Sequence, residues 1–255
     1  MTQQFKSGDV TIAYEVFGEG PLVVAIHGFA SNHRVNWIDT SWVTALAGAG
    51  YRVAALDNRG HGESQKLYAP EAYAPALMAR DILNLVGHLE TGSAALLGYS
   101  MGARIAAFAA LAAPDTVKAV VMGGLGIRLV EGMADTPAII AGLENPDLNA
   151  VRGTPGWPYR AFAQQTRSDL KALAACMRGS RQSLSADELA GVTQPVLVVT
   201  GSQDAISGEA APLARLIPNG ESLTVPGRDH MKTTGDPAFK TAALDFLSRH
   251  YPARL

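Results

Sequence analysis

The stretch Ala94-Ala95-Leu96-Leu97-Gly98-Tyr99-Ser100-Met101-Gly102 joins a short apolar run to an Ala-rich segment over 103–113. This order predicts a buried strand, a sharp turn and a helix. A serine at such a turn takes a strained backbone conformation, which persists only where its surroundings fix it. Glycine fits at 98 and 102 because side chains there would collide with the adjacent strand and helix. The hydroxyl of Ser100 is therefore expected to stand clear of the sheet, beside the positive end of the helix.

The composition is that of one large domain, or of one domain with an insertion. The chain has 255 residues, 47% of them hydrophobic, and a formal charge of −2. This charge gives no attraction to nucleic acid or to anionic lipid. The single Cys176 cannot form an internal disulfide and fits a reducing compartment. The first residues lack a signal-peptide pattern, and no apolar run is long enough to cross a bilayer. We therefore expect a cytoplasmic protein without nucleic-acid or membrane partners; the oligomeric state leaves no signal.

Apolar runs alternate with segments of helical spacing along most of the chain. Continuously apolar runs, typical of strands buried on both faces of a parallel sheet, occupy 22–26, 51–56, 94–97, 117–122 and 195–200. Residues 9–17 alternate like an edge strand, and 221–225 form the last strand. Helices are expected at about 42–49, 73–89, 103–113, 210–217 and 236–250. This rhythm predicts an α/β fold with a mainly parallel central sheet flanked by helices.

The strand–helix rhythm stops in the middle of the chain. We interpret residues 125–190 as a small, mostly helical insertion over the sheet, so that residues 1–124 and 191–255 form the main domain. Ordinary connecting helices are the alternative. Trp157, Tyr159 and Phe162 of this segment are candidate substrate-pocket residues, although core packing explains each of them equally well.

Three polar side chains fall in loops after predicted strands, at the sheet edge where ligands of parallel sheets bind. Ser100 is the candidate nucleophile, but a serine hydroxyl needs a base, and the base needs a group that orients it. His230 is the candidate base because it alone combines a late chain position with a strand-end position. Asp204 is the candidate orienting acid. Its rival, Asp229, is the immediate neighbour of His230 and is poorly placed behind the ring.

Other polar residues near these loops are expected to be structural. His27 should fix the loop after its strand, whereas His33 in the same loop could reach the pocket. Asp57 and His61 lie in a glycine-rich turn and could be interpreted as catalytic. We favour a structural role, in which Asp57 and Arg59 hold this turn through charge-assisted hydrogen bonds.

Backbone amides complete the predicted site. Attack of a serine on an ester produces an oxyanion, and its stabilisation is usually the largest catalytic contribution. The N–H of Met101, directly after Ser100, is one expected donor. The second is the N–H of Phe29, in the loop after His27-Gly28.

Together these motifs resemble the α/β-hydrolase superfamily, in which the catalytic residues follow the order Ser, Asp, His. The resemblance is carried by His27-Gly28-Phe29, Asp57-x-Arg59-Gly60-x-Gly62-x-Ser64, Gly98-x-Ser100-x-Gly102, Gly201-x-x-Asp204 and the Gly227 to His230 loop. It extends over about residues 9–248 and is weakest between 125 and 190. The superfamily usually carries its cap there, so the resemblance implies that this insertion covers the active site.

The serine at position 100 separates the chain from haloalkane dehalogenases and epoxide hydrolases, which use an aspartate there. The motifs are similar to those of small carboxylesterases, enol-lactonases and cofactor-free haloperoxidases. The implied function is hydrolysis of small or medium carboxylic esters through an acyl-enzyme on Ser100. The alternatives are lactone or carbon–carbon bond hydrolysis, peracid formation on the same residues, or a hydrolase-like ligand receptor. No metal or cofactor is expected, because Cys176 is alone, the histidines lack ligand spacing and no dinucleotide-binding glycine motif follows a strand.

Overall fold

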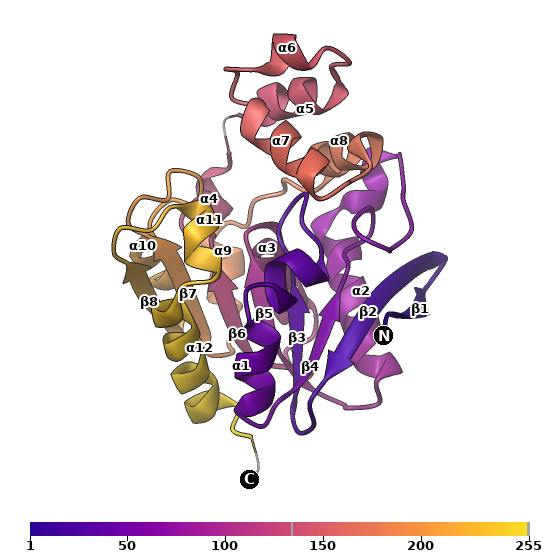
Figure 1. Cartoon of the computed structure of the whole chain (residues 1–255). Helices are drawn as coiled ribbons and strands as arrows, with labels where there is room; N and C mark the ends of the chain where they lie inside the picture. Colours follow the sequence, from indigo (N-terminus) through magenta and orange to yellow (C-terminus); the bar gives the residue numbers. More distant parts are fainter. Residues whose placement is uncertain (134, 254–255) are drawn as a thin grey trace.

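One eight-stranded sheet forms the centre of the molecule (Figure 1), and the computed structural model describes residues 1–133 and 135–253. The spatial strand order is β1-β2-β4-β3-β5-β6-β7-β8. The pairs β1–β2 and β2–β4 are antiparallel, and the other pairs are parallel. The strands are β1 (Gln3–Ser7), β2 (Val10–Phe17), β3 (Leu22–Ile26), β4 (Arg52–Leu56), β5 (Ala94–Tyr99), β6 (Val117–Gly123), β7 (Val196–Gly201) and β8 (Gly220–Val225). The predicted α/β class and mainly parallel sheet are confirmed.

Helices cover both faces of this sheet. One face packs against α1 (Trp42–Gly48) and α12 (Pro237–His250), which bury Trp42 and Phe246 (Figure 1). The other face packs against α2 (Pro75–His88), α3 (Met101–Ala112) and α10 (Ala210–Ala214). Short helices η1 (Arg34–Ile38), η2 (Pro70–Tyr73) and α11 (His230–Thr234) lie in the connecting loops. Within the described residues, no helix is long and apolar enough to cross a membrane.

The sequence analysis does not predict the first strand, β1. β1 forms an antiparallel hairpin with β2, and Gly8 at the turn has a φ of 61°. Only Phe5 and Ser7 of its five residues are buried, so its polar sequence carries little apolar alternation. Pairing with β2, rather than burial of its own side chains, makes this segment a strand.

The turn between β5 and α3 has the predicted strain and the predicted crowding. Ser100 has φ 54° and ψ −110°, a conformation that is costly for a residue with a side chain. A Cβ added at Gly98 would lie 2.3 Å from the backbone oxygen of Gly102 in α3. A Cβ added at Gly102 would lie 1.9 Å from the backbone oxygen of Ile26 in β3. Both glycines are therefore required for the close contact between α3 and the sheet.

The middle of the chain is helical and partly stands apart from the sheet. It contains α4 (Arg128–Glu131), α5 (Thr136–Glu144), α6 (Leu148–Val151), α7 (Trp157–Gln165), α8 (Leu170–Gly179) and α9 (Ala186–Ala190). Helices α5–α8 stand above the edge at which the parallel strands end (Figure 1), and we call them the cap. The cap has its own small core, which includes Ile139, Leu143 and Leu173.

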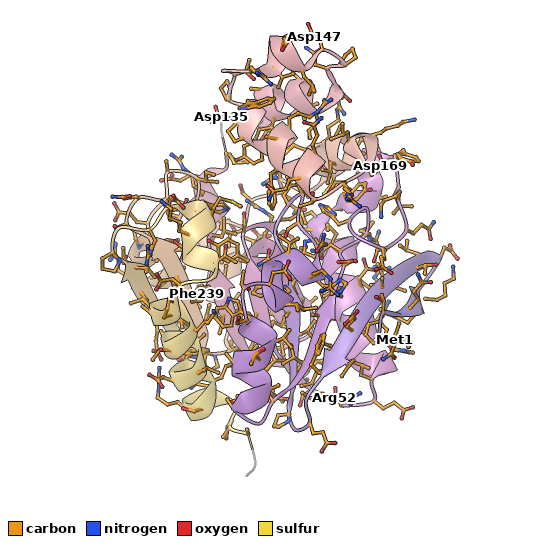
Figure 2. The ribbon with its side chains drawn as sticks, viewed as in Figure 1. Met1, Arg52, Asp135, Asp147, Asp169 and Phe239 are labelled. Atoms are coloured by element: carbon orange, nitrogen blue, oxygen red, sulfur yellow. The ribbon has the colours of Figure 1, made fainter. Side chains whose placement is uncertain are left out.

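Contacts to two loops of the main domain fix the cap. The Tyr68 hydroxyl donates to Oδ2 of Asp169 at 3.0 Å, and Figure 2 shows Asp169 at the start of α8, where the cap meets the main domain. The Thr166 hydroxyl donates to the backbone oxygen of Ala30 at 2.8 Å. The second contact joins the cap directly to the loop after β3.

The loop after β4 is held by a buried carboxylate. Asp57 accepts hydrogen bonds from the backbone N–H of His33 at 2.8 Å, from Nδ1 of His33 at 2.8 Å and from the backbone N–H of Glu63 at 2.7 Å. Burial by itself raises the pKa of the Asp57 carboxyl, but the His33 hydrogen bonds and the neighbouring imidazoles outweigh it and hold that pKa well below its ordinary range. Arg59 forms a two-bond ion pair with Asp81, at 2.7 and 2.8 Å. Each side chain therefore holds the turn, as expected, but through different partners.

We expect Gly102→Ala to lower the free energy of unfolding by about 1–3 kcal/mol, because its Cβ meets the Ile26 oxygen across two elements that cannot both move. Gly87→Ala in α2 is the matched control, since a Cβ there meets nothing within 4 Å, and it should leave stability unchanged or raise it slightly. Urea unfolding measures both. Equal effects of the two changes would contradict the packing argument.

Asp57→Asn should lower the free energy of unfolding at pH 7 by about 2 kcal/mol, because an amide NH₂ then faces an N–H donor. The native pKa of Asp57 lies below the unfolded value of about 3.9, so its contribution is complete above that pH and is lost as the pH falls. The difference between wild type and variant should therefore shrink between pH 5 and pH 3. Urea unfolding across this range tests it, with exposed Asp115→Asn as control. A difference that grows on acidification would refute the assignment.

Candidate active site

Three loops at one edge of the sheet bring Ser100, Asp204 and His230 together. Ser100 follows β5, Asp204 follows β7, and His230 begins α11 after β8. His230 Nε2 lies 3.2 Å from Ser100 Oγ, and His230 Nδ1 lies 2.9 Å from Asp204 Oδ2. The imidazole thus lies between the hydroxyl and the carboxylate. In this order a proton can pass from the hydroxyl to the ring while the carboxylate stabilises the resulting cation.

Asp204 is held in place by its own loop. Its Oδ1 accepts the backbone N–H groups of Ile206 and Ser207, both at 3.0 Å, and its Oδ2 accepts the Ser207 hydroxyl at 2.6 Å. Burial raises the pKa of the Asp204 carboxyl, but the hydrogen bonds from His230 and Ser207 more than offset it, so the pKa lies below its usual value. The carboxylate is therefore ionised at neutral pH and directed at the ring.

The rival carboxylate serves a different purpose. Asp229 caps α11, where its Oδ1 accepts the backbone N–H of Lys232 at 2.8 Å, and its side chain is 45% exposed. Tyr99 donates its hydroxyl hydrogen to the backbone oxygen of His230. Asp229, at the start of α11, and Tyr99 therefore fix the backbone around His230. Asp229 forms no hydrogen bond with the His230 ring among the described residues.

Two backbone amides beside Ser100 are unused. Within residues 1–133 and 135–253, neither the N–H of Phe29 nor that of Met101 has a hydrogen-bond acceptor, and both residues border the same cavity. The loop that carries Phe29 is fixed by a 3.0 Å bond from the Gly28 N–H to Asn36 Oδ1 and by the cap contact at Ala30. Free donors on fixed backbone are suited to a developing oxygen anion.

A cavity of about 600 Å³ lies between the cap and these loops. Tyr159 and Phe162, two of the three predicted pocket residues, line it. Trp157 does not, and Arg152 instead lies over its ring at 5.4 Å from the centroid. The physical reason is helical geometry: Pro158, Tyr159 and Phe162 share the face of α7 that borders the cavity, whereas Trp157 lies off that face.

The other histidines of these loops contact the framework rather than Ser100. His27 Nε2 accepts the Asn58 N–H at 3.0 Å, and its Nδ1 lies 2.7 Å from the Gly28 oxygen, so His27 fixes the loop as expected. Burial is the main cause that lowers the pKa of His27 to about 4 and that of His61 to about 3. Both rings are therefore neutral at neutral pH. His33 is bound to Asp57 and does not border the cavity.

Sequence reasoning missed several cavity and support residues. Ser207 lies three residues after Asp204, a spacing at which a hydroxyl can bond back to an aspartate. Arg104 and Arg181 border the cavity. A signal for Arg104 existed, because it is the one charged residue in the Ala-rich segment that begins one turn after Ser100.

Comparisons with known proteins agree with this architecture. A family model described as the alpha/beta hydrolase fold matches residues 21–137. The chain is 29% identical to 2-(acetamidomethylene)succinate hydrolase of Mesorhizobium japonicum, over 96% of this chain and 94% of the relative. Epoxide hydrolase B of Mycobacterium tuberculosis is 34% identical, over 58% of this chain and 41% of that protein. A bromoperoxidase from Bacillus anthracis superposes with a TM-score of 0.81 at 24% identity, over 97% of this chain and 100% of the other.

The two relatives named above are hydrolases with different substrates, and the structural neighbour shares the fold. These matches fit the sheet order and the strained turn between β5 and α3. We conclude that the chain belongs to the α/β-hydrolase superfamily.

Proposed function

We propose that this protein is a serine hydrolase that cleaves small or medium carboxylic esters through an acyl-enzyme on Ser100. The observation that carries the proposal is the continuous contact from Ser100 Oγ to His230 Nε2 and from His230 Nδ1 to Asp204. A serine that serves only the fold needs neither a base nor an oriented acid behind it. A cytoplasmic location stays a prediction from the sequence.

In the first half-reaction, Ser100 Oγ attacks the ester carbonyl carbon while His230 Nε2 accepts the hydroxyl proton. The negative charge on the former carbonyl oxygen is stabilised by the N–H groups of Phe29 and Met101. Asp204 stabilises the imidazolium that forms. The imidazolium then returns its proton to the leaving alkoxide, and the carbonyl re-forms as the acyl-enzyme.

In the second half-reaction, water takes the place of the alcohol. His230 removes a proton from this water, whose oxygen attacks the acyl carbon. The same two amides stabilise the second oxyanion, and collapse of that intermediate expels Ser100 Oγ, which recovers its proton from His230. The products are a carboxylic acid and the free enzyme, so no co-reactant beyond water is required.

The cavity under the cap fits a small substrate. Its volume of about 600 Å³ leaves room for an ester of modest size, and apolar residues such as Phe29, Met101, Leu125 and Phe162 line much of it. A largely apolar wall with a few polar groups at the reacting end is typical of small-molecule sites.

Ser100→Ala should abolish sustained hydrolysis of short-chain nitrophenyl esters, with a fall in kcat of at least about a thousandfold. Release of nitrophenolate measures it, and Ser248→Ala, a change at an exposed hydroxyl, is the matched control. A fluorophosphonate probe should label the wild type on the peptide that contains Ser100 and leave the variant unlabelled. Turnover retained by Ser100→Ala would remove Ser100 from the nucleophile role.

Asp204→Asn should lower kcat by about ten-thousandfold, because the amide favours the imidazole tautomer with its proton on the wrong nitrogen. Asp229→Asn is the discriminating control: asparagine also caps a helix, so its activity should stay within a few-fold of the wild type. The same ester assay compares both. A larger loss from the change at 229 than from the change at 204 would reverse the assignment of the acid.

The alternative functions predict different outcomes in the same assays. A panel of lactones, assayed beside the esters and beside peroxide-dependent halogenation in acetate, ranks these reactions by kcat/KM. A higher kcat/KM for lactones or for peracid formation would replace the ester assignment while keeping Ser100 as nucleophile. A single burst of nitrophenolate with no steady rate on any ester would favour a ligand receptor.

A further inference from the structure

Two arginines at the cavity, Arg104 and Arg181, form no ion pair with any described residue, although the carboxylate of Asp135 also borders the cavity. Arg104 lies on α3, one helical turn after Ser100, and only 3% of its surface is exposed. Its Nη1 donates to the backbone oxygen of Gln182. Within the described part of the chain, its Nε and Nη2 have no acceptor, and no carboxylate lies within ion-pair distance of its guanidinium.

Arg181 approaches the same cavity from the segment that follows α8. Its guanidinium lies over the ring of Phe29, 5.6 Å from the centroid, and its Nε contacts the Met177 sulfur at 3.0 Å. No ion pair is formed by Arg181 with any residue in 1–133 or 135–253. The two guanidiniums are close enough that the charge of Arg181, after burial, contributes to lowering the pKa of Arg104 to about 10. Arg104 is still protonated at neutral pH.

Two other buried arginines, Arg59 and Arg160, find acceptors away from the cavity, although Nε of Arg160 has none among the described residues. Arg59 forms a two-bond ion pair with Asp81, and Nη1 of Arg160 donates to three backbone oxygens of the cap. Arg128, a third arginine at the cavity, is half-exposed and pairs with Glu131 at 3.1 Å. Of the three described arginines that border the cavity, only Arg104 and Arg181 therefore lack a carboxylate partner.

Burial of a guanidinium without an opposite charge costs free energy, and a second positive charge nearby increases this cost. Folding alone does not require the arrangement, because Gln182 could be bound by a neutral donor. An anion in the cavity offsets the cost of both charges at once. Guanidinium groups are well suited to carboxylates, which they bind through paired N–H donors.

We propose that Arg104 and Arg181 form a carboxylate-binding subsite, so that the preferred substrates are half-esters of short dicarboxylic acids with the free carboxylate on the acyl part. This inference rests on the hydrolase function proposed above. It names the substrate class within that function.

The acyl side is favoured by where the arginines lie. The leaving alcohol must lie against His230 Nε2, which protonates it, and neither arginine contacts His230. Arg181 instead lies over the ring of Phe29, and Arg104 extends from the helix that begins with Met101. Phe29 and Met101 are the two residues whose N–H groups are proposed to bind the carbonyl oxygen of the acyl part. The backbone of Arg104 lies about 6 Å along α3 from Ser100, since four residues separate them by about 1.5 Å each. Its side chain leans back toward the start of the helix, so only a short spacer separates the two carbonyl groups.

Two substrates of nearly the same shape separate the effect of the carboxylate charge from that of shape. Methyl hydrogen succinate and methyl levulinate have nearly the same shape, but only the first carries a carboxylate. The wild type should have a kcat/KM at least about tenfold higher for the anionic ester. Arg104→Gln and Arg181→Gln should each remove most of this preference, measured within each variant as the ratio of the two kcat/KM values. Arg104→Lys should retain part of it.

Two controls test position and specificity. Arg178→Gln removes an arginine that is 40% exposed and paired with Glu144 outside the cavity, and it should leave the preference unchanged. The pair acetoxyacetate and acetoxyacetone moves the charge to the alcohol side, where no anionic preference is expected. A preference for acetoxyacetate over acetoxyacetone that equals or exceeds the succinate preference would overturn the acyl-side assignment.

A binding measurement separates this inference from the hydrolase proposal. In Ser100→Ala, which cannot form the acyl-enzyme, methyl hydrogen succinate should raise the melting temperature more than methyl levulinate does. Adding Arg104→Gln or Arg181→Gln to Ser100→Ala should abolish this difference in melting temperature between the two esters. If one double variant does not fold, the other is sufficient for the test. Hydrolysis of both esters without an anionic preference would refute the subsite and leave the hydrolase intact. Selective stabilisation without turnover of any ester would support the subsite and refute the hydrolase.

Discussion

The close contact between α3 and the centre of the sheet is the constraint on which the site depends. Gly102 lies against the backbone oxygen of Ile26, and Gly98 lies against that of Gly102, at distances that no side chain permits. This contact forces Ser100 to a φ of 54°, and a 2.8 Å bond from its N–H to the Gly123 oxygen holds it there. The strain is localised at one residue because buried strands on both sides and the packed helix leave the backbone no alternative.

The parallel sheet brings the remaining groups to the same place. β7 and β8 are paired so that Gly201 lies opposite Val225, and the loops that follow these residues carry Asp204 and His230. Hydrogen bonds then fix each side chain. Ser207 holds Asp204, whereas Tyr99 and the Asp229 side chain at the start of α11 hold the backbone of His230. The sheet determines the approximate positions of the groups, and these local hydrogen bonds determine their orientation.

Buried charges are treated in two different ways in this protein. Asp57, Asp81 and Asp204 are each matched by donors or by a cation, and they stabilise loops. Arg104 and Arg181 lie at the cavity without a matching carboxylate in the described chain. A charge that the fold pairs holds the loops around it, whereas an unpaired guanidinium beside a cavity keeps its N–H donors available for a ligand. The proposed substrate class follows from this difference.

The sequence by itself determined the α/β class, the strand runs and the turn at Ser100, because these depend on local apolar patterning and on glycine geometry. It also identified Ser100, Asp204 and His230 as candidates, since strand-end positions in a parallel sheet converge on one edge. Only the tertiary structure decided that β1 is a strand, that Ser207 supports Asp204, and that Tyr159 and Phe162 line the cavity while Trp157 does not. Pairing across the sheet, hydrogen bonds within a folded loop, and the rotation of α7 about its axis all depend on contacts between distant segments. The absence of an ion-pair partner for Arg104 and Arg181 among the described residues also depends on tertiary structure, because the fold determines which side chains lie beside each charge.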